Sequence, residues 1–240
     1  MRNHLILLTV LAALLLISTS AQAVEFGPNS ANITNRYFPA KIGGWSYMLG
    51  VGTSVGSVFY LNAVGIEEVS GARIGAQNFN NVKCLKVNVI ETEETDSGDF
   101  YNVWMAQDTQ GNLWFLKFYD VFNDETTVLG GTDLKSMFMP YVPDVGDPAG
   151  IIMPETATTY CRVVEADISI DTNFGNYNSC IKSHCVYDLS LESVDYYCPN
   201  VGWVRQVDMD DGIPEDVRDL KEYGTASVTN TKVVVVPLGD

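Results

Sequence analysis

The sequence is poor in basic residues and in histidine. Lys and Arg number 14 against 30 Asp and Glu, so the formal net charge is −16, and there are only two histidines. So acidic a chain repels nucleic acid, and we expect no nucleic-acid partner. No two cysteines have CxxC spacing, and His184 is the only histidine outside the N-terminal leader, so a zinc site is not expected either.

A second long apolar run is also missing. The single run, residues 5–17, follows Arg2 and precedes the small residues Ala21 and Ala23. This pattern predicts a secretory signal peptide over residues 1–23. No cysteine follows the run, so we expect an exported protein, periplasmic or extracellular, that is not a lipoprotein and has no transmembrane segment after cleavage. Without the leader, 13 Lys and Arg face 30 Asp and Glu, and the net charge is −17.

The cysteines indicate disulfides, because an exported chain reaches an oxidising compartment. A hairpin turning at 171–176 would place Cys161 opposite Cys185, whereas a turn at 189–193 would place Cys198 opposite the same Cys185. The sequence leaves both pairings open. Cys84 is alone in its half of the chain and is the candidate for a free thiol. The disulfide candidates are Cys161, Cys180, Cys185 and Cys198.

Alternating apolar and polar residues, rich in β-branched and aromatic types, continue from Trp45 to Val207. They predict a mainly β protein of antiparallel sheets, arranged as a curled sheet, an open half-barrel or a sandwich. The segment AQDTQGNLW, residues 106–114, predicts a hairpin turn in which Gly111 takes positive φ. We divide the chain into an N-terminal segment at 24–36, a first β half at 37–130, a connecting loop at 131–154 and a second β half at 155–211.

One helix is expected near the C-terminus. Pro214 suits a first helical turn, Glu215 and Asp216 suit the positive end of the helix dipole, and Gly224 suits its end. We therefore expect residues 212–240 to hold one short helix and then a last strand at 231–240.

Three pairs of segments resemble one another in the same order along the chain: 78–89 with 173–186, 100–120 with 194–210, and 37–45 with 141–149. The first pair shares Asn-Phe and Cys-apolar-Lys, and the second shares an aromatic strand, a tight turn and a Trp strand. This predicts a tandem duplication, with two related halves.

The motifs YFPAKIGGWSY, WMAQDTQGNLW and PNVGWV, within residues 37–207, resemble a diffuse group of exported, mostly uncharacterised bacterial β proteins. The resemblance implies an antiparallel sheet curled like the half-barrel of periplasmic lipoprotein carriers, and it implies no catalytic residue. This sequence departs from the group at VGDPAGIIM, which has no Trp.

The acidic stretch DMDDGIPED is similar to a calcium loop but one residue short, so the adjacent Asp210 and Asp211 would point apart. We interpret this stretch as an acidic strand end. The alternative is one weak calcium site, with calcium as the cofactor and Asp208, Asp210, Asp211 and Glu215 as its ligands.

Aromatic residues at strand positions either fill the core or line an apolar surface for a ligand. The candidate ligand-binding residues are Trp104, Trp114, Phe118 and Trp203. We predict a non-enzymatic protein that binds an apolar or amphipathic small molecule, or an envelope protein. The alternatives are a polysaccharide hydrolase with paired carboxylates, and a structural or adhesion module. His184 and Cys185 are adjacent on a strand and point to opposite faces, so they do not form a catalytic pair.

Overall fold

The computed structural model describes residues 23–92, 99–128, 130–131, 137–150, 160–187 and 191–225. Most of the signal peptide expected at 1–23 and the last strand expected at 231–240 lie outside these ranges. In chain order the elements are β1 (Gly44–Gly50), the 3-10 turn η1 (Gly52–Ser54), β2 (Val58–Val69), β3 (Ala72–Ile74), β4 (Gln77–Phe79), β5 (Val82–Thr92), β6 (Asp99–Gln107), β7 (Leu113–Asp120), β8 (Glu125–Val128), β9 (Gly130–Gly131), β10 (Met137–Met139), β11 (Tyr160–Asp171), β12 (Asn176–Val186), β13 (Leu191–Cys198), β14 (Gly202–Asp210) and β15 (Ile213–Thr225).

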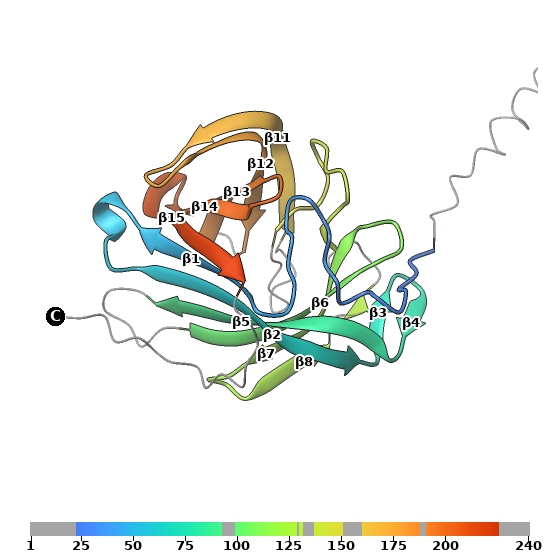
Figure 1. The fold of residues 1–240 in the computed structure, drawn as a ribbon. Coiled ribbons are helices and arrows are strands. Elements are labelled where there is room, and N and C mark those ends of the chain that lie inside the picture. Colours follow the sequence, from blue (N-terminus) through green and yellow to red (C-terminus); the bar gives the residue numbers. More distant parts are fainter. Residues whose placement is uncertain are drawn as a thin grey trace, which may run out of the picture.

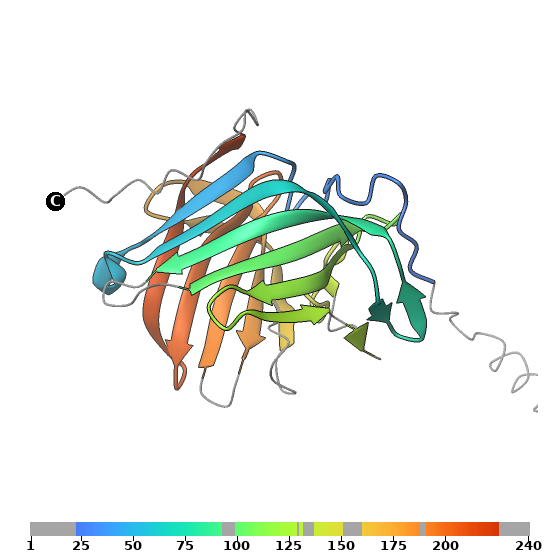
Figure 2. The same cartoon turned by 90° about the horizontal axis from the view of Figure 1, so that it is seen from below.

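Twelve strands form one curled antiparallel sheet. Its order is β10-β7-β6-β5-β2-β1-β15-β14-β13-β12-β11, and β8 also pairs with β7. Figure 1 shows β11 to β15 on one side of the interior and β2, β5, β6 and β7 on the other, with the N-terminal segment between them. In Figure 2, seen from below, the strands of the first group cross steeply behind those of the second. The expected antiparallel β fold is confirmed, and strands from both expected halves lie in one sheet.

Each side of the sheet contains a four-stranded antiparallel meander. The first consists of β2, β5, β6 and β7, and the second of β11, β12, β13 and β14; along the sheet both run from their last strand to their first. The matched segments 78–89 and 173–186 contain most of β5 and β12, respectively. The duplication stays a prediction, because equal strand order is a likeness of topology and does not by itself show that one half was copied from the other.

The prediction of a C-terminal helix is wrong. Residues 213–225 form β15, which pairs with β14 on one side and with β1 on the other and so joins the two meanders. The signal that decides this is Asp211-Gly212, whose φ angles of 47° and 77° suit the tight turn of a two-residue hairpin. Pro214 is accommodated because the register shifts at Met209, the residue it faces.

The sheet has two apolar cores, one on each face. The inner core fills the curl and includes Phe59, Phe138 and Tyr197. The outer core lies under the small β4-β3-β9 sheet and includes Trp104 and Trp114. The β6 and β7 strands are therefore covered on both faces. This explains why aromatic residues occupy both odd- and even-numbered positions in these strands.

The expected connecting loop contains β10 and a segment that reaches both ends of the sheet. The backbone N–H of Gly150 donates to the Phe138 carbonyl of β10 at 2.9 Å. On the other side, the N–H of Gly146 donates to the Val163 carbonyl of β11, and the N–H of Val163 donates to the Asp147 carbonyl at 2.9 Å. Residues 146–150 thus lie between the two terminal strands, which do not pair with each other in the described ranges.

Two disulfides cross-link the second meander. The hairpin turn between β11 and β12 places Cys161 directly opposite Cys185, and these two are bonded. The register of β12 with β13 brings Cys180 beside Cys198, which form the second bond. Cys84 is free, as predicted, and its side chain is buried. Disulfides of this kind are typical of proteins outside the reducing cytosol.

Candidate functional site

The N-terminal segment crosses the concave face of the sheet as a strap, which we define as residues 30–41 (Figure 1). Ala31, Ile33, Tyr37 and Phe38 are buried in the inner core. These apolar residues hold the strap against the sheet because exposing them again would cost roughly 1.5–3 kcal/mol for each large side chain.

Asn35 fixes the middle of the strap. Its side-chain amide donates to the carbonyls of Gly111 at 3.3 Å and Pro140 at 3.0 Å, and its Oδ1 accepts from the backbone N–H of Tyr37 at 3.0 Å. The Gln107 Oε1 accepts from the backbone N–H of Asn35 at 2.8 Å. The amide is fully buried, and these bonds supply the partners that burial requires.

A cleft of about 460 Å³ lies between the strap and the sheet. The strap forms one wall, and strands β1, β2, β5 and β15 with the β13–β14 turn form the other. The lining residues are Asn32, Ile33, Thr34, Phe38, Pro39, Ala40, Lys41, Gly44, Trp45, Ser46, Leu61, Ala63, Val87, Asn200, Val201, Gly202, Trp203, Tyr223, Gly224 and Thr225.

The floor of the cleft is apolar. Leu61, Ala63, Val87 and Trp203 are buried there and are almost closed to solvent. The Trp203 indole packs edge-on against Phe59, with ring centroids 4.8 Å apart, and its N–H donates to the Arg205 carbonyl at 3.0 Å. The indole is therefore held in place with its polar group satisfied, and it offers the cleft an apolar surface.

The four aromatic candidates do not form one site. Trp203 lines the cleft, whereas Phe118 lies in the inner core away from the cleft lining, and Trp104 and Trp114 lie in the outer core. All four are at least nine-tenths buried. The sequence could not separate core from ligand surface here, because β6 and β7, which carry Trp104, Trp114 and Phe118, are covered on both faces.

Trp104 has a structural role. Its ring lies between the ammonium groups of Lys117, 4.1 Å from the ring centroid, and Lys86, at 5.0 Å. Its indole N–H donates to Glu67 Oε2 at 2.8 Å. These contacts are cation–π and charge-assisted interactions that order the outer face of β5, β6 and β7.

The four candidate calcium ligands are also dispersed. Asp208 accepts from Arg218 at 2.8 Å, while Asp210, Asp211 and Glu215 are exposed around the β14–β15 turn. Across the described ranges, no three His, Cys, Asp or Glu residues come together as a group that could hold a metal ion.

A charged cluster occupies the end of the sheet interior near this hairpin. The Arg218 guanidinium is completely buried and pairs with Glu91 at 2.9 Å, Asp208 at 2.8 Å and Asp216 at 2.6 Å. A buried guanidinium requires such partners, because an unpaired buried charge would be costly. None of these residues lines the cleft.

Asp195 is a buried acid at this end. Its Oδ2 accepts from the Ser193 hydroxyl at 3.4 Å, and its Oδ1 has no hydrogen-bond partner among the described residues. Burial raises the pKa of Asp195 well above its usual value, and the nearby carboxylate of Asp208 adds to the rise. Burial at this position therefore disfavours the charged form of Asp195.

The sequence interpretation missed the strap as a functional element. Residues 24–36 were assigned only as an N-terminal segment, although Ala31, Ile33 and Tyr37 recur at even spacing and Phe38 follows. That alternation was the available signal for an extended stretch with one buried face. The approach of Lys41 and Asn200 to the same cleft could not be predicted, since it depends on how the strap crosses the sheet.

No protein-family model matches this chain, and no curated protein sequence matches it significantly. Two solved structures resemble it. One, from Bacteroides fragilis, is described as exported and as having a YmcC-like fold; it is 9% identical, has a TM-score of 0.44, and the likeness covers 80% of this chain and 100% of that one. The other, described as a lipoprotein from Parabacteroides distasonis, is 13% identical, has a TM-score of 0.41, and the likeness covers 79% and 99% of the two chains. At these TM-scores neither likeness carries the argument further. No helix within the described ranges is long and apolar enough to span a membrane.

Proposed function

We propose that this protein is an exported, non-enzymatic binding protein that takes an apolar or amphipathic small molecule into the cleft under the strap. The observation that supports this is the apolar floor of Leu61, Val87 and Trp203 within a cleft of about 460 Å³. Small-molecule sites commonly measure roughly 300–1,000 Å³ and combine apolar walls with a few polar groups at the opening.

The structure gives less support to the hydrolase alternative. A glycosidase needs two carboxylates that face a substrate cleft. The acids with raised pKa, Asp195 and Asp208, lie in the charged end of the interior and outside the cleft lining. We therefore retain ligand binding as the proposed function.

A substitution at Ser46 tests the site. Ser46 lines the cleft from β1 and faces Leu61 across the β1–β2 ladder. Ser46→Trp would place an indole in the cleft, so we expect binding of N-phenyl-1-naphthylamine, an uncharged fluorescent apolar probe, to weaken at least tenfold relative to wild type.

Tyr47→Trp is the matched control. Adjacent strand residues point to opposite faces, and Tyr47 is outside the cleft lining, so the same new side chain should leave probe binding unchanged. Thermal melts establish that both variants fold. Equal probe affinity in the two variants, or no saturable binding to wild type, would refute the proposed function.

A further inference from the structure

The rim of the cleft has an unusual charge distribution for this chain. Of the lining residues that the structure describes, none is Asp or Glu, although the chain has 30 acids and only 14 basic residues. The one charged residue in the lining is Lys41, which is exposed and forms no ion pair within the described ranges. Elsewhere in the lining, Asn32, Thr34, Asn200 and Tyr223 supply amide and hydroxyl groups.

This arrangement favours acceptor groups on the ligand. An ammonium, two amides and two hydroxyls can all donate hydrogen bonds, whereas a cationic head would find no carboxylate in the described lining. The overall charge of −16 repels anions at long range, but salt screens this field over about 8 Å at physiological ionic strength. Inside the rim, the nearest charge therefore decides which head is accepted.

We propose that the ligand is a single-chain amphiphile with an anionic head, whose chain lies on Leu61, Val87 and Trp203 and whose head pairs with Lys41. The inference rests on the proposed function and adds the class of ligand. A volume of about 460 Å³ is in the lower part of the roughly 300–1,000 Å³ range for small-molecule sites, which suits one alkyl chain and a small head.

The test compares three probes of equal chain length: a fourteen-carbon fatty acid, the corresponding alcohol and the corresponding trimethylammonium salt. Each displaces N-phenyl-1-naphthylamine from the full mature protein, below its micelle concentration. In wild type we expect the fatty acid to bind about two- to fivefold more tightly than the alcohol, the range that one exposed ion pair supplies, and the ammonium salt to bind most weakly.

Lys41→Gln should remove the preference for the fatty acid over the alcohol and leave the affinity for the alcohol unchanged. Lys83→Gln, which makes the same charge change at an exposed residue outside the cleft, should keep the preference. High salt should reduce the preference in wild type and have little effect on it in Lys41→Gln.

The outcomes separate the two proposals. If alcohol and fatty acid bind equally, or if Lys41→Gln keeps the preference, the inference about the head is overturned while the cleft remains the binding site. If no probe binds saturably, or if Ser46→Trp leaves the affinity for the alcohol unchanged, both the inference and the proposed function fail.

Discussion

The indole N–H of Trp114 donates a hydrogen bond to Asp108 Oδ2 at 2.9 Å, across the turn that joins β6 to β7. The other oxygen, Oδ1, accepts from the backbone N–H groups of Gln110 and Asn112, each at 2.9 Å. One carboxylate thus holds the turn and satisfies a buried donor in the outer core. The predicted turn is confirmed, with Gly111 at φ 92°.

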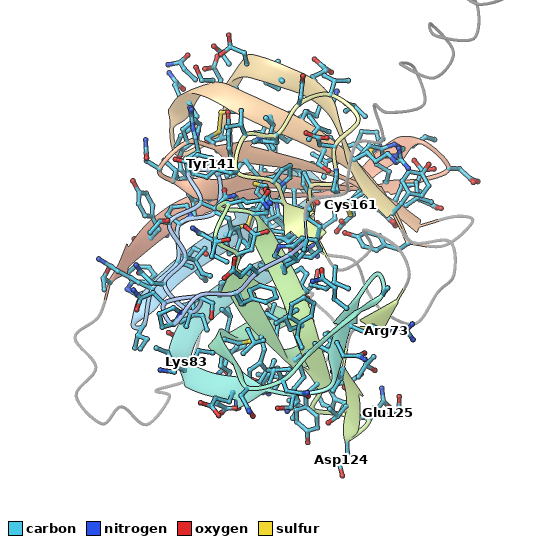
Figure 3. The ribbon with its side chains drawn as sticks, turned by 90° about the vertical axis from the view of Figure 1, so that its right-hand side faces the viewer. Arg73, Lys83, Asp124, Glu125, Tyr141 and Cys161 are labelled. Carbon is cyan, nitrogen blue, oxygen red and sulfur yellow. A yellow bond between two sulfur atoms is a disulfide. The ribbon has the colours of Figure 1, made fainter. Side chains whose placement is uncertain are left out.

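Asp108→Ala should therefore lower the free energy of unfolding by roughly 2–3 kcal/mol, because it leaves the Trp114 N–H buried without an acceptor. Urea unfolding measures the change. The control is Asp120→Ala, because Asp120 holds the exposed β7–β8 turn through Phe122 and Asn123 without a buried donor. Figure 3 shows the neighbouring Asp124 and Glu125 at the outer tip of that hairpin. Equal losses in the two variants would contradict the role assigned to Trp114.

Asp195→Asn should make the protein more stable at about pH 8. The pKa of Asp195 is raised above its ordinary 3.8 by burial, so the folded state favours the protonated acid. The stability that the bound proton contributes is fully present below pH 3.8, and it is lost as the pH rises through the raised pKa of Asp195. Asn stays neutral at every pH. The free energy of unfolding that Asp195→Asn gains over wild type, measured by urea unfolding, should therefore grow from about pH 4 to pH 8. A gain that does not depend on pH would contradict the assignment.

Asp219→Asn should have the opposite pH dependence. Burial alone would raise the pKa of Asp219, but hydrogen bonds from Arg205, with Nη2 2.8 Å from Oδ2, and from Asn173 outweigh burial and lower it. The carboxylate therefore contributes stability above the ordinary value of 3.8 that is lost as the pH falls through the lowered value. The destabilisation caused by Asp219→Asn should be largest near pH 7 and should shrink in acid, in the same assay. A destabilisation that stays constant with pH would rule out the Arg205–Asp219 ion pair as its cause.

Thiol labelling tests the disulfide pairing and the state of Cys84 together. Burial raises the pKa of Cys84 to about 12, so the native thiol should not react with iodoacetamide at about pH 8. After unfolding without reductant, one thiol per chain should react, because the other four cysteines are bonded. Mass spectrometry of the peptides should find the label on Cys84. Labelling at Cys161, Cys180, Cys185 or Cys198 would contradict the pairing.

Calcium is tested by melting the protein with chelator and with millimolar Ca²⁺. Asp208 is held by Arg218, and Asp210, Asp211 and Glu215 are exposed, so we expect no change in melting temperature. A rise of several degrees would instead favour the calcium loop, and loss of that rise in Asp211→Asn would place the ion at the β14–β15 turn.

The sequence was sufficient for the fold class because strand alternation is a local signal. The same locality explains the wrong helix at 212–224. Pro214, Glu215 and Gly224 match the start and end of a helix, but Asp211-Gly212 is a stronger hairpin signal, and pairing with β1 and β14 decides the conformation. The alternation of Val217, Arg218, Asp219 and Leu220 does not show as an apolar and polar pattern in the sequence. The reason is that Arg218, a charged residue, occupies an inward-facing position.

The candidate site could be predicted only in part. Of the candidate ligand-binding residues, Trp203 lines the cleft, but Trp104 and Trp114 have the same strand context and lie on the opposite face. Which face a strand residue takes follows from alternation, but what covers that face follows from tertiary structure. The small β4-β3-β9 sheet covers one face and the strap covers the other. Neither covering element can be predicted from the sequence next to the tryptophans.

The segment at 146–150 also has a consequence for the protein in concentrated solution. An open antiparallel sheet can recruit a strand from another molecule at either edge, which leads to aggregation. Here that segment occupies both edges at once through Phe138 and Val163, and the rest of β11 is interrupted by three register shifts and by Asp167 at φ 53°. Such irregular edges are poor templates for a further strand, so we expect the chain to resist fibre formation without having to close its sheet.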